Sequence, residues 1–263
     1  MYKTKENVMN RVCEHYELAK NTHDVFVCAA YGSWNYNGMS DDKSDVDTKC
    51  LTVPTFRDLA LNKKNVSFTH VMENDEHLEL KDVRLYFDLL KKQNPSFLEI
   101  LFTDYCYVNP KYSSVFDTLK DNRELIAQYD PERLMSACLG QIFQKQKTLT
   151  HRFGVQIDND GYDGKQLANS YRILDMMKCI DNGGTFEEAL NSSEYHIEFL
   201  SSLKRNNEPS IDKKRALELM EEIITEAQLL KQNFTLKDVV KTKEVDRLLE
   251  QALLDLFAIS LAL

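Results

Sequence analysis

Two short motifs in the first fifty residues have the residue types and the spacing needed for chemistry on a phosphate. Gly32 and Ser33 follow a run of apolar residues. After eleven intervening residues come Asp45, Val46 and Asp47. Carboxylates at i and i+2 of an extended segment point to one face of a sheet, because side chains alternate with a period of two. Two such acids repel each other unless a cation lies between them. Their hard oxygen ligands suit Mg²⁺, which completes its coordination with waters and substrate phosphates.

The glycine-serine pair supplies the complementary feature, a place for an anion. The apolar run 25–31 predicts a buried strand that ends at Gly32 and Ser33. A turn of this kind allows backbone N–H groups to approach a phosphate closely, and the Ser33 hydroxyl adds a further donor. By the period of two, Lys49 lies on the face of the two aspartates, where it would neutralise a triphosphate or pair with the carboxylates. A simple exposed lysine is the alternative.

The spacing of residues 32–33 and 45–47 resembles the signature of the DNA polymerase β-like nucleotidyltransferase superfamily. The segment Asp-Val-Arg at 82–84 and the block Asn-Pro-x-x-Leu-Glu at 94–99 are similar to one branch of it, the predicted nucleotidyltransferases of bacterial RNA-repair operons and phages. The likeness covers about the first half of the chain. It implies transfer of a nucleoside monophosphate from an NTP to a hydroxyl acceptor, with release of pyrophosphate.

The resemblance implies roles for individual acids. Asp45 and Asp47 would be catalytic metal ligands for Mg²⁺ or Mn²⁺, and a third acid is expected on the third strand of the core. Glu79 fits this position, because the alternation of residues 77–81 places it on the polar face of a half-buried strand. Asp82 is the alternative, although it equally fits the N-cap of the helix that follows.

The resemblance also implies cations from a helical domain, since family members commonly bind the triphosphate from there. Lys165 and Arg172 lie at i and i+7, on one face of the predicted helix 164–180. Together with the glycine-serine turn and Lys49 they are the expected binding residues for the nucleotide. A solvated charged helix face is the alternative interpretation.

The expected fold class is α+β: a small mixed β-sheet nucleotidyltransferase core flanked by helices, followed by an all-helical C-terminal domain. We predict a catalytic domain over 1–125 and a helical domain over 126–263. The strands are expected at 24–31, 45–53 and 77–81, and residues 66–72 are expected to form a short strand or an extended lid. Apolar residues at a spacing of three to four predict helices at 131–153, 164–180, 194–204, 211–233 and 236–263.

Composition limits the class of protein and of partner. The chain has 263 residues, of which 43% are hydrophobic and 29% charged, as in ordinary globular proteins. Its six cysteines include no Cys-x-x-Cys pair, which favours reduced thiols. The N-terminus lacks the apolar run of a signal peptide, so we expect a cytoplasmic protein without a membrane partner. The net charge of −9 provides no overall basic excess, so an RNA would have to meet a local patch.

The sequence leaves other functions open. A non-catalytic nucleotide- or RNA-binding module would keep the same fold and the same turn. An aminoglycoside-modifying or toxin-like transferase is a weaker alternative, because the superfamily includes such activities. The choice of NTP, the acceptor (an RNA end, a protein or a small molecule) and the oligomeric state do not follow from the sequence.

Overall fold

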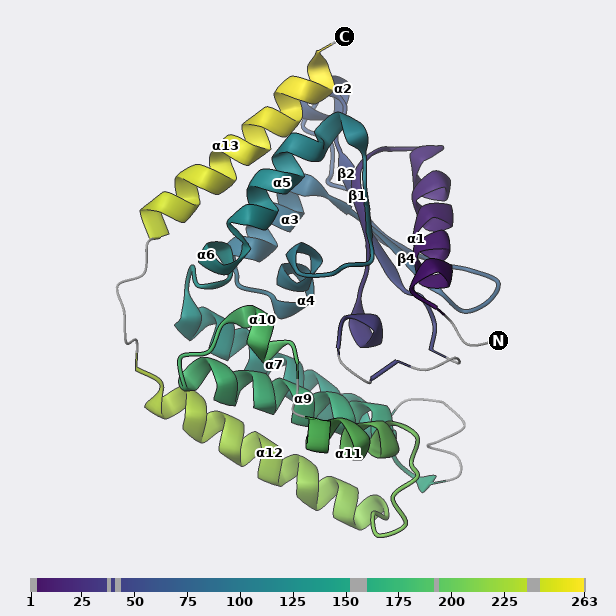
Figure 1. Cartoon of the computed structure of the whole chain (residues 1–263), viewed down its shortest axis with the longest axis vertical. Coiled ribbons are helices and arrows are strands. Elements are labelled where there is room, and N and C mark those ends of the chain that lie inside the picture. Colours follow the sequence, from purple (N-terminus) through teal and green to yellow (C-terminus); the bar gives the residue numbers. More distant parts are fainter. Residues whose placement is uncertain are drawn as a thin grey trace. The chain divides into compact units, whose positions relative to one another are not determined.

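A computed structural model describes residues 4–36, 39–40, 44–151, 160–191, 194–235 and 242–262. The chain divides into two compact units: the first comprises residues 1–35, 40–130 and 240–263, and the second comprises residues 36–39 and 131–239. A small sheet with flanking helices forms the first unit, and helices form the second (Figure 1). The predicted α+β fold class is therefore confirmed.

The sheet of the first unit has five strands in the order β3-β4-β2-β1-β5. They are β1 (Asp24–Ala30), β2 (Thr48–Val53), β3 (Ser67–Val71), β4 (His77–Asp82) and β5 (Cys106–Val108). β2 and β4 are parallel, whereas the other neighbouring pairs are antiparallel, which makes the sheet mixed as predicted. Every residue of β2 is buried, as expected for a strand covered on both faces.

Helices and short 3₁₀ turns surround this sheet. The helices are α1 (Lys5–Lys20), α2 (Phe56–Ala60), α3 (Val83–Lys91), α4 (Pro95–Leu98), α5 (Ser113–Asp121), α6 (Arg123–Ala127) and α13 (Thr242–Leu261). The 3₁₀ turns are η1 (Gly32–Asn35), η2 (Glu99–Leu101) and η3 (Pro110–Tyr112). α1 buries Val8 and Val12 in one hydrophobic cluster with Val46 and Leu78, so it covers one face of the sheet. Phe26 of β1 packs edge-on against residues of η3 and α5.

The second unit is built around one central helix. Its helices are α7 (Pro131–Leu149), α9 (Gly164–Asp181), α10 (Phe186–Ala189), α11 (Glu194–Lys204) and α12 (Lys213–Asn233). α9 packs against α7, α10, α11 and α12, and its buried residues lie on several of its faces. A helix enclosed in this way is expected to be apolar around most of its circumference. The four long helices of this unit agree with the periodicity of the sequence over the described residues.

The C-terminal helix departs from the predicted domain division. We expected α13 in a helical domain over 126–263, but it belongs to the first unit. Its apolar stripe, which includes Leu249 and Leu256, is buried there. Asp246 accepts a hydrogen bond from the Tyr129 hydroxyl at 3.1 Å and pairs with Lys91 of α3 at 2.9 Å. Apolar periodicity identifies a helix, whereas it does not say which body the helix packs on.

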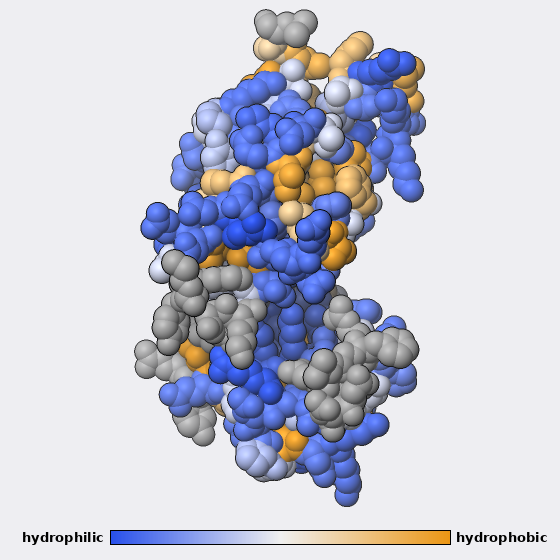
Figure 2. Space-filling model, turned by 90° about the vertical axis from the view of Figure 1, so that its right-hand side faces the viewer, coloured by the Kyte–Doolittle hydropathy of each residue, from blue (hydrophilic) through white to orange (hydrophobic). Residues whose placement is uncertain are grey.

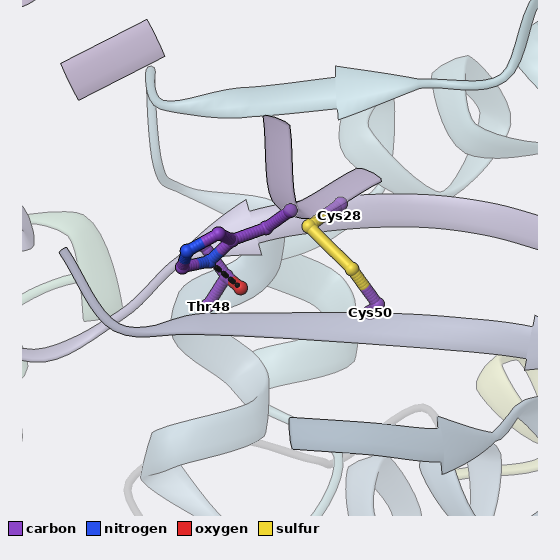
Figure 3. Close-up of a disulfide and its surroundings, with 4 residues drawn as sticks. Cys28, Thr48 and Cys50 are labelled. Carbon is purple, nitrogen blue, oxygen red and sulfur yellow. Dashed lines mark hydrogen bonds between the residues drawn. A yellow bond between two sulfur atoms is a disulfide. The ribbon is translucent and has the colours of Figure 1, made fainter. Parts of the chain in front are cut away.

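Two of the six cysteines are joined in the centre of the sheet. Cys28 of β1 and Cys50 of β2 are direct partners in the antiparallel register. Their sulfur atoms form a disulfide (Figure 3), and their Cα atoms are 4.1 Å apart. The expectation of reduced thiols is wrong for this pair. A separation of 22 residues carries no local motif, and only the strand register brings the two side chains together.

The surface is predominantly hydrophilic on the side drawn in Figure 2, with hydrophobic residues exposed in patches in its upper part. β3 is an edge strand whose residues are all exposed, including Phe68 and Val71. Among the helices of the described residues, none has both the length and the apolar composition to cross a bilayer.

Candidate functional site

The structure brings the glycine-serine turn and the aspartate segment side by side. β1 ends just before Gly32, whose φ of +79° lies in the left-handed region that favours glycine. The Tyr31 N–H donates to the Asp47 carbonyl at 3.0 Å. One turn later, the Trp34 indole N–H donates to the Asp45 carbonyl at 2.8 Å. The turn and the aspartate segment are therefore joined by one backbone hydrogen bond from Tyr31 and one side-chain hydrogen bond from Trp34.

The two aspartates precede β2 rather than lying within it. We predicted a strand from Asp45, but β2 begins at Thr48, after the Tyr31–Asp47 hydrogen bond. Val46 is fully buried in the cluster under α1, whereas Asp45 is exposed and the side chain of Asp47 is 27% exposed. This alternation of burial is the pattern that two carboxylates on one open face require.

Asp47 is anchored by the first residue of β4. Its Oδ1 accepts a hydrogen bond from the backbone N–H of His77 at 2.9 Å and lies 3.1 Å from Nδ1 of the same residue. The imidazole is 42% exposed, so it remains open to solvent. These contacts fix one carboxylate oxygen of Asp47 and hold the end of β2 beside the start of β4.

Glu79 and Lys49 face each other across the parallel pair β2–β4. They are register partners, and Lys49 Nζ lies 3.8 Å from Glu79 Oε2. Glu79 Oε1 pairs with Lys81 Nζ at 3.0 Å. Lys49 is buried, and its ammonium lies 3.0 Å from the centre of the Tyr31 ring, a cation–π geometry. Burial lowers the pKa of Lys49 to about 8, although the charges of Glu99, Glu79 and Asp47 act in the opposite direction.

Asp82, the alternative third acid, has a structural role in this arrangement. It lies on the strand face of Leu80, opposite to that of Glu79. Its carboxylate caps α3 by accepting from the Arg84 N–H at 2.9 Å. The Arg84 guanidinium adds two further hydrogen bonds, at 2.9 and 2.6 Å. Its oxygens are therefore committed to the helix start and to one arginine.

The donor atoms suit a hard divalent cation in kind. Asp45, Asp47 and Glu79 present carboxylate oxygens, which Mg²⁺ and Mn²⁺ prefer. Within the described part of the chain, no three His, Cys, Asp or Glu side chains stand as a ready metal cluster. The oxygens of Asp47 and Glu79 instead contact His77, Lys49 and Lys81. A metal ion at this place would take over contacts that these protein groups now make.

The predicted cations of the second unit differ from each other. Arg172 is 7% exposed, and its guanidinium lies 3.6 Å from the centre of the Tyr36 ring, which belongs to the same unit. Its Nε and one terminal nitrogen, Nη1, are buried and have no hydrogen-bond partner within the described part of the chain. Lys165, seven residues earlier on α9, is exposed. Arg172 thus has the character of an anion-binding group, whereas Lys165 has the character of a solvated lysine.

A buried acid that the sequence did not indicate lies behind the aspartate segment. Glu76 is 3% exposed, and its Oε1 accepts a hydrogen bond from the Val46 N–H at 3.2 Å. Glu76 lies in the polar run Glu-Asn-Asp-Glu-His at 73–77, which is typical of an exposed turn. No local pattern distinguishes it from its exposed neighbours. Only the contact with Val46, thirty residues away, shows its place in the site.

Comparison of the chain with protein-family models, with curated proteins and with solved structures yields no match.

Proposed function

We propose that the chain is a metal-dependent nucleotidyltransferase of the DNA polymerase β-like superfamily. It transfers a nucleoside monophosphate from an NTP to a hydroxyl acceptor. In this reaction the acceptor oxygen forms a bond to the α-phosphorus, the bond to the β-phosphate oxygen breaks, and pyrophosphate leaves. The proton of the hydroxyl passes to water or to a nearby carboxylate. An RNA end is the acceptor that the resemblance favours, and a protein or a small molecule is the alternative.

One observation carries this proposal. Tyr31, directly before the Gly32–Asn35 turn, donates its backbone N–H to the Asp47 carbonyl, and the Trp34 indole N–H within the turn donates to the Asp45 carbonyl, so the turn lies beside the two aspartates. A turn alone, or a pair of acids alone, is common in proteins. Their direct pairing, with a third acid on the adjacent parallel strand, supports a site that binds a phosphate and a cation together.

In the proposed reaction, the acids, Ser33 and Lys49 would have different roles, which follow from their side-chain chemistry. Asp45 and Asp47, with Glu79, would hold Mg²⁺ or Mn²⁺, which when bound neutralises charge on the attacking and leaving oxygens. Ser33 would donate hydrogen bonds to the phosphates. Lys49 is buried between Tyr31 and the acids, so it would offset the negative charge of the carboxylates.

A second candidate function rests on a specific observation. The carboxylates of Asp47 and Glu79 are paired with protein groups, among them Lys49 and His77. A site whose acids are balanced without a metal would suit a non-catalytic nucleotide-binding module. Nucleotide binding that is independent of Mg²⁺, and unchanged by loss of both aspartates, would favour this alternative.

The test is transfer of label from each α-labelled NTP. The purified chain is incubated with Mg²⁺ or Mn²⁺ and total RNA, and separately with a protein mixture as acceptor. We expect labelled product and pyrophosphate with wild type, and none with the double variant Asp45→Asn/Asp47→Asn. Glu73→Gln is the matched control, because Glu73 is an exposed acid in the turn before β4. Equal transfer by wild type and the double variant would refute the catalytic role of the aspartates.

A further inference from the structure

Glu76 is a buried carboxylate that is held from α1. Its Oε2 accepts hydrogen bonds from Nε of Arg11 at 2.9 Å and from a terminal nitrogen of the same guanidinium at 2.5 Å. His15 Nε2 lies 3.4 Å from the same oxygen. Burial acts to raise the pKa of Glu76, but the hydrogen bonds from Arg11, Asn74 and Val46 outweigh it and hold the pKa below its usual value. Glu76 is therefore an anion in the interior of the first unit.

The other oxygen of Glu76 reaches the middle of the aspartate segment. Oε1 accepts from the Val46 N–H, and the next residue, His77, donates its own N–H to Asp47 Oδ1. Two consecutive residues at the start of β4, Glu76 and His77, thus hold two consecutive residues before β2, Val46 and Asp47. Because Val46 is buried on the α1 side, Glu76 holds the segment from the face opposite to the open carboxylates.

The contact is directional and charge-assisted. A hydrogen bond from a backbone N–H to an ionised carboxylate is stronger than one between neutral groups. The Arg11 guanidinium, whose side chain is 28% exposed, supplies the opposite charge and donates twice to Oε2, which leaves Oε1 directed at Val46. A buried charge of this kind is costly in an apolar core, so an apolar residue would be the simpler choice for stability alone.

We propose that Glu76, oriented by Arg11, is a positioning residue that fixes Asp45 and Asp47 for cation binding. Its catalytic consequence rests on the proposed nucleotidyltransferase function, whereas its effect on the aspartate segment does not. Residues that orient metal ligands change metal affinity or activity by about tenfold to a hundredfold when they are lost.

Trp34 offers a local probe that is independent of activity. It is the only tryptophan of the chain, and its indole N–H is bonded to the Asp45 carbonyl at 2.8 Å. Its fluorescence reports on the aspartate segment. Tb³⁺, a hard cation that binds carboxylate oxygens, is the metal probe, because its luminescence is excited through a nearby indole.

The decisive variant is Glu76→Gln. A glutamine amide presents one oxygen and one NH₂ group, so it cannot accept from both Val46 and Arg11. We expect a folded protein with shifted Trp34 emission, about tenfold weaker Tb³⁺ binding and a lower kcat at nearly unchanged KM for the NTP. Glu14→Gln is the matched control. Glu14 also pairs with Arg11 and its side chain is 57% exposed, so its loss should leave all three readouts unchanged.

A second variant covers the case in which Glu76→Gln does not fold. Arg11→Lys keeps the charge but loses the paired donors, and we expect the same changes at smaller size. A folded Glu76→Gln, or failing that a folded Arg11→Lys, with wild-type Trp34 emission and wild-type Tb³⁺ affinity would overturn the proposal. If the wild type transfers no label but the variant still shifts emission and weakens Tb³⁺ binding, the positioning role stands and the proposed function falls. If the wild type binds no Tb³⁺, the emission of Trp34 alone decides.

Discussion

The two units satisfy their charged groups in different ways. In the first unit, Asp47 and Glu79 have partners from the protein itself: His77 for the former, Lys49 and Lys81 for the latter. In the second unit, the buried guanidinium of Arg172 lies against the ring of Tyr36, and two of its nitrogens have no hydrogen-bond partner among the described residues. The first arrangement is balanced in the absence of any ligand, whereas the second is incomplete.

This difference separates two kinds of site. A buried polar group without a partner costs free energy, which a bound anion would relieve. We therefore expect a bound phosphate to stabilise the Arg172 side chain more than a cation stabilises the acids of the first unit. Those acids would have to give up their contacts with protein groups in order to bind the cation. The same contacts explain how the fold holds Asp47 and Glu79 close together: Lys49 and Lys81 offset the charge of Glu79, and the His77 N–H donates to Asp47.

The largest expected effect would come from the first unit. Glu79→Gln removes the charge of the third acid with little change of volume. If Glu79 holds a catalytic metal, nucleotidyl transfer should fall about a hundredfold, or about 3 kcal/mol in the activation free energy. Initial rates with saturating NTP measure this, with circular dichroism as the check on folding. Glu73→Gln is the control, and a rate within twofold of wild type for Glu79→Gln would remove Glu79 from the site.

The sequence predicted those parts of the first unit that depend on local patterns. The alternation of Leu78 and Leu80 with polar neighbours identified β4 and placed Glu79 on the polar face. The N-cap role of Asp82 also followed from its position before an apolar helical pattern. The pairing of the Gly32 turn with Asp45 was expected from their spacing, and the hydrogen bonds between them agree with it.

The features that the sequence missed depend on contacts between distant residues or are too short to show a pattern. Cys28 and Cys50 meet only because β1 and β2 adopt one register. The short edge strand β5 has too few residues for a period to be recognised. Glu76 lies in a polar run, and its burial arises from Arg11 of α1, 65 residues away. Periodicity and propensity describe neighbours in the chain, so they carry no information on such pairs.

A second prediction concerns the unpartnered cation. Arg172→Met should weaken binding of inorganic triphosphate about tenfold, which corresponds to about 1.4 kcal/mol. The thermal midpoint should not fall, because the variant removes a buried group that lacks hydrogen-bond partners. Titration calorimetry and differential scanning calorimetry measure the two quantities. Lys214→Met, which removes one charge from a side chain that is 86% exposed, is the control. A loss of stability without a loss of binding would mean that Arg172 is a packing residue.

A third, smaller effect separates the two candidate third acids. Asp82→Asn weakens both the cap of α3 and the pairing with Arg84, so the free energy of unfolding should fall by about 1 kcal/mol. Nucleotidyl transfer should stay within twofold of wild type, because Asp82 lies on the strand face opposite to Glu79. Urea denaturation and the transfer assay measure the two results. A loss of transfer as large as that of Glu79→Gln would reverse the assignment of the two acids.

The smallest expected effect comes from His15, which lies beside Arg11 and Glu76 behind the aspartate segment. It tests whether this cluster accepts an additional proton. His15 is fully buried, and burial lowers its pKa from 6.5; Arg11 acts in the same direction, whereas Glu76 opposes it. Below about pH 6.5 the unfolded chain binds a proton at His15 that the folded chain does not yet bind, so the free energy of unfolding should decrease as the pH falls.

Replacing His15 by glutamine isolates this contribution from those of the other titrating groups. Urea denaturation at pH 7.5 and at pH 5.5 should show a smaller decrease for His15→Gln than for wild type, because the variant has no imidazole to protonate. The result tests the contrast between the units. A larger decrease of the free energy of unfolding in wild type would mean that the cluster of Arg11, His15 and Glu76 does not stabilise a further positive charge. Equal decreases in both proteins would mean that a proton on His15 is accommodated there, and that this part of the first unit is less tightly balanced than its hydrogen bonds indicate.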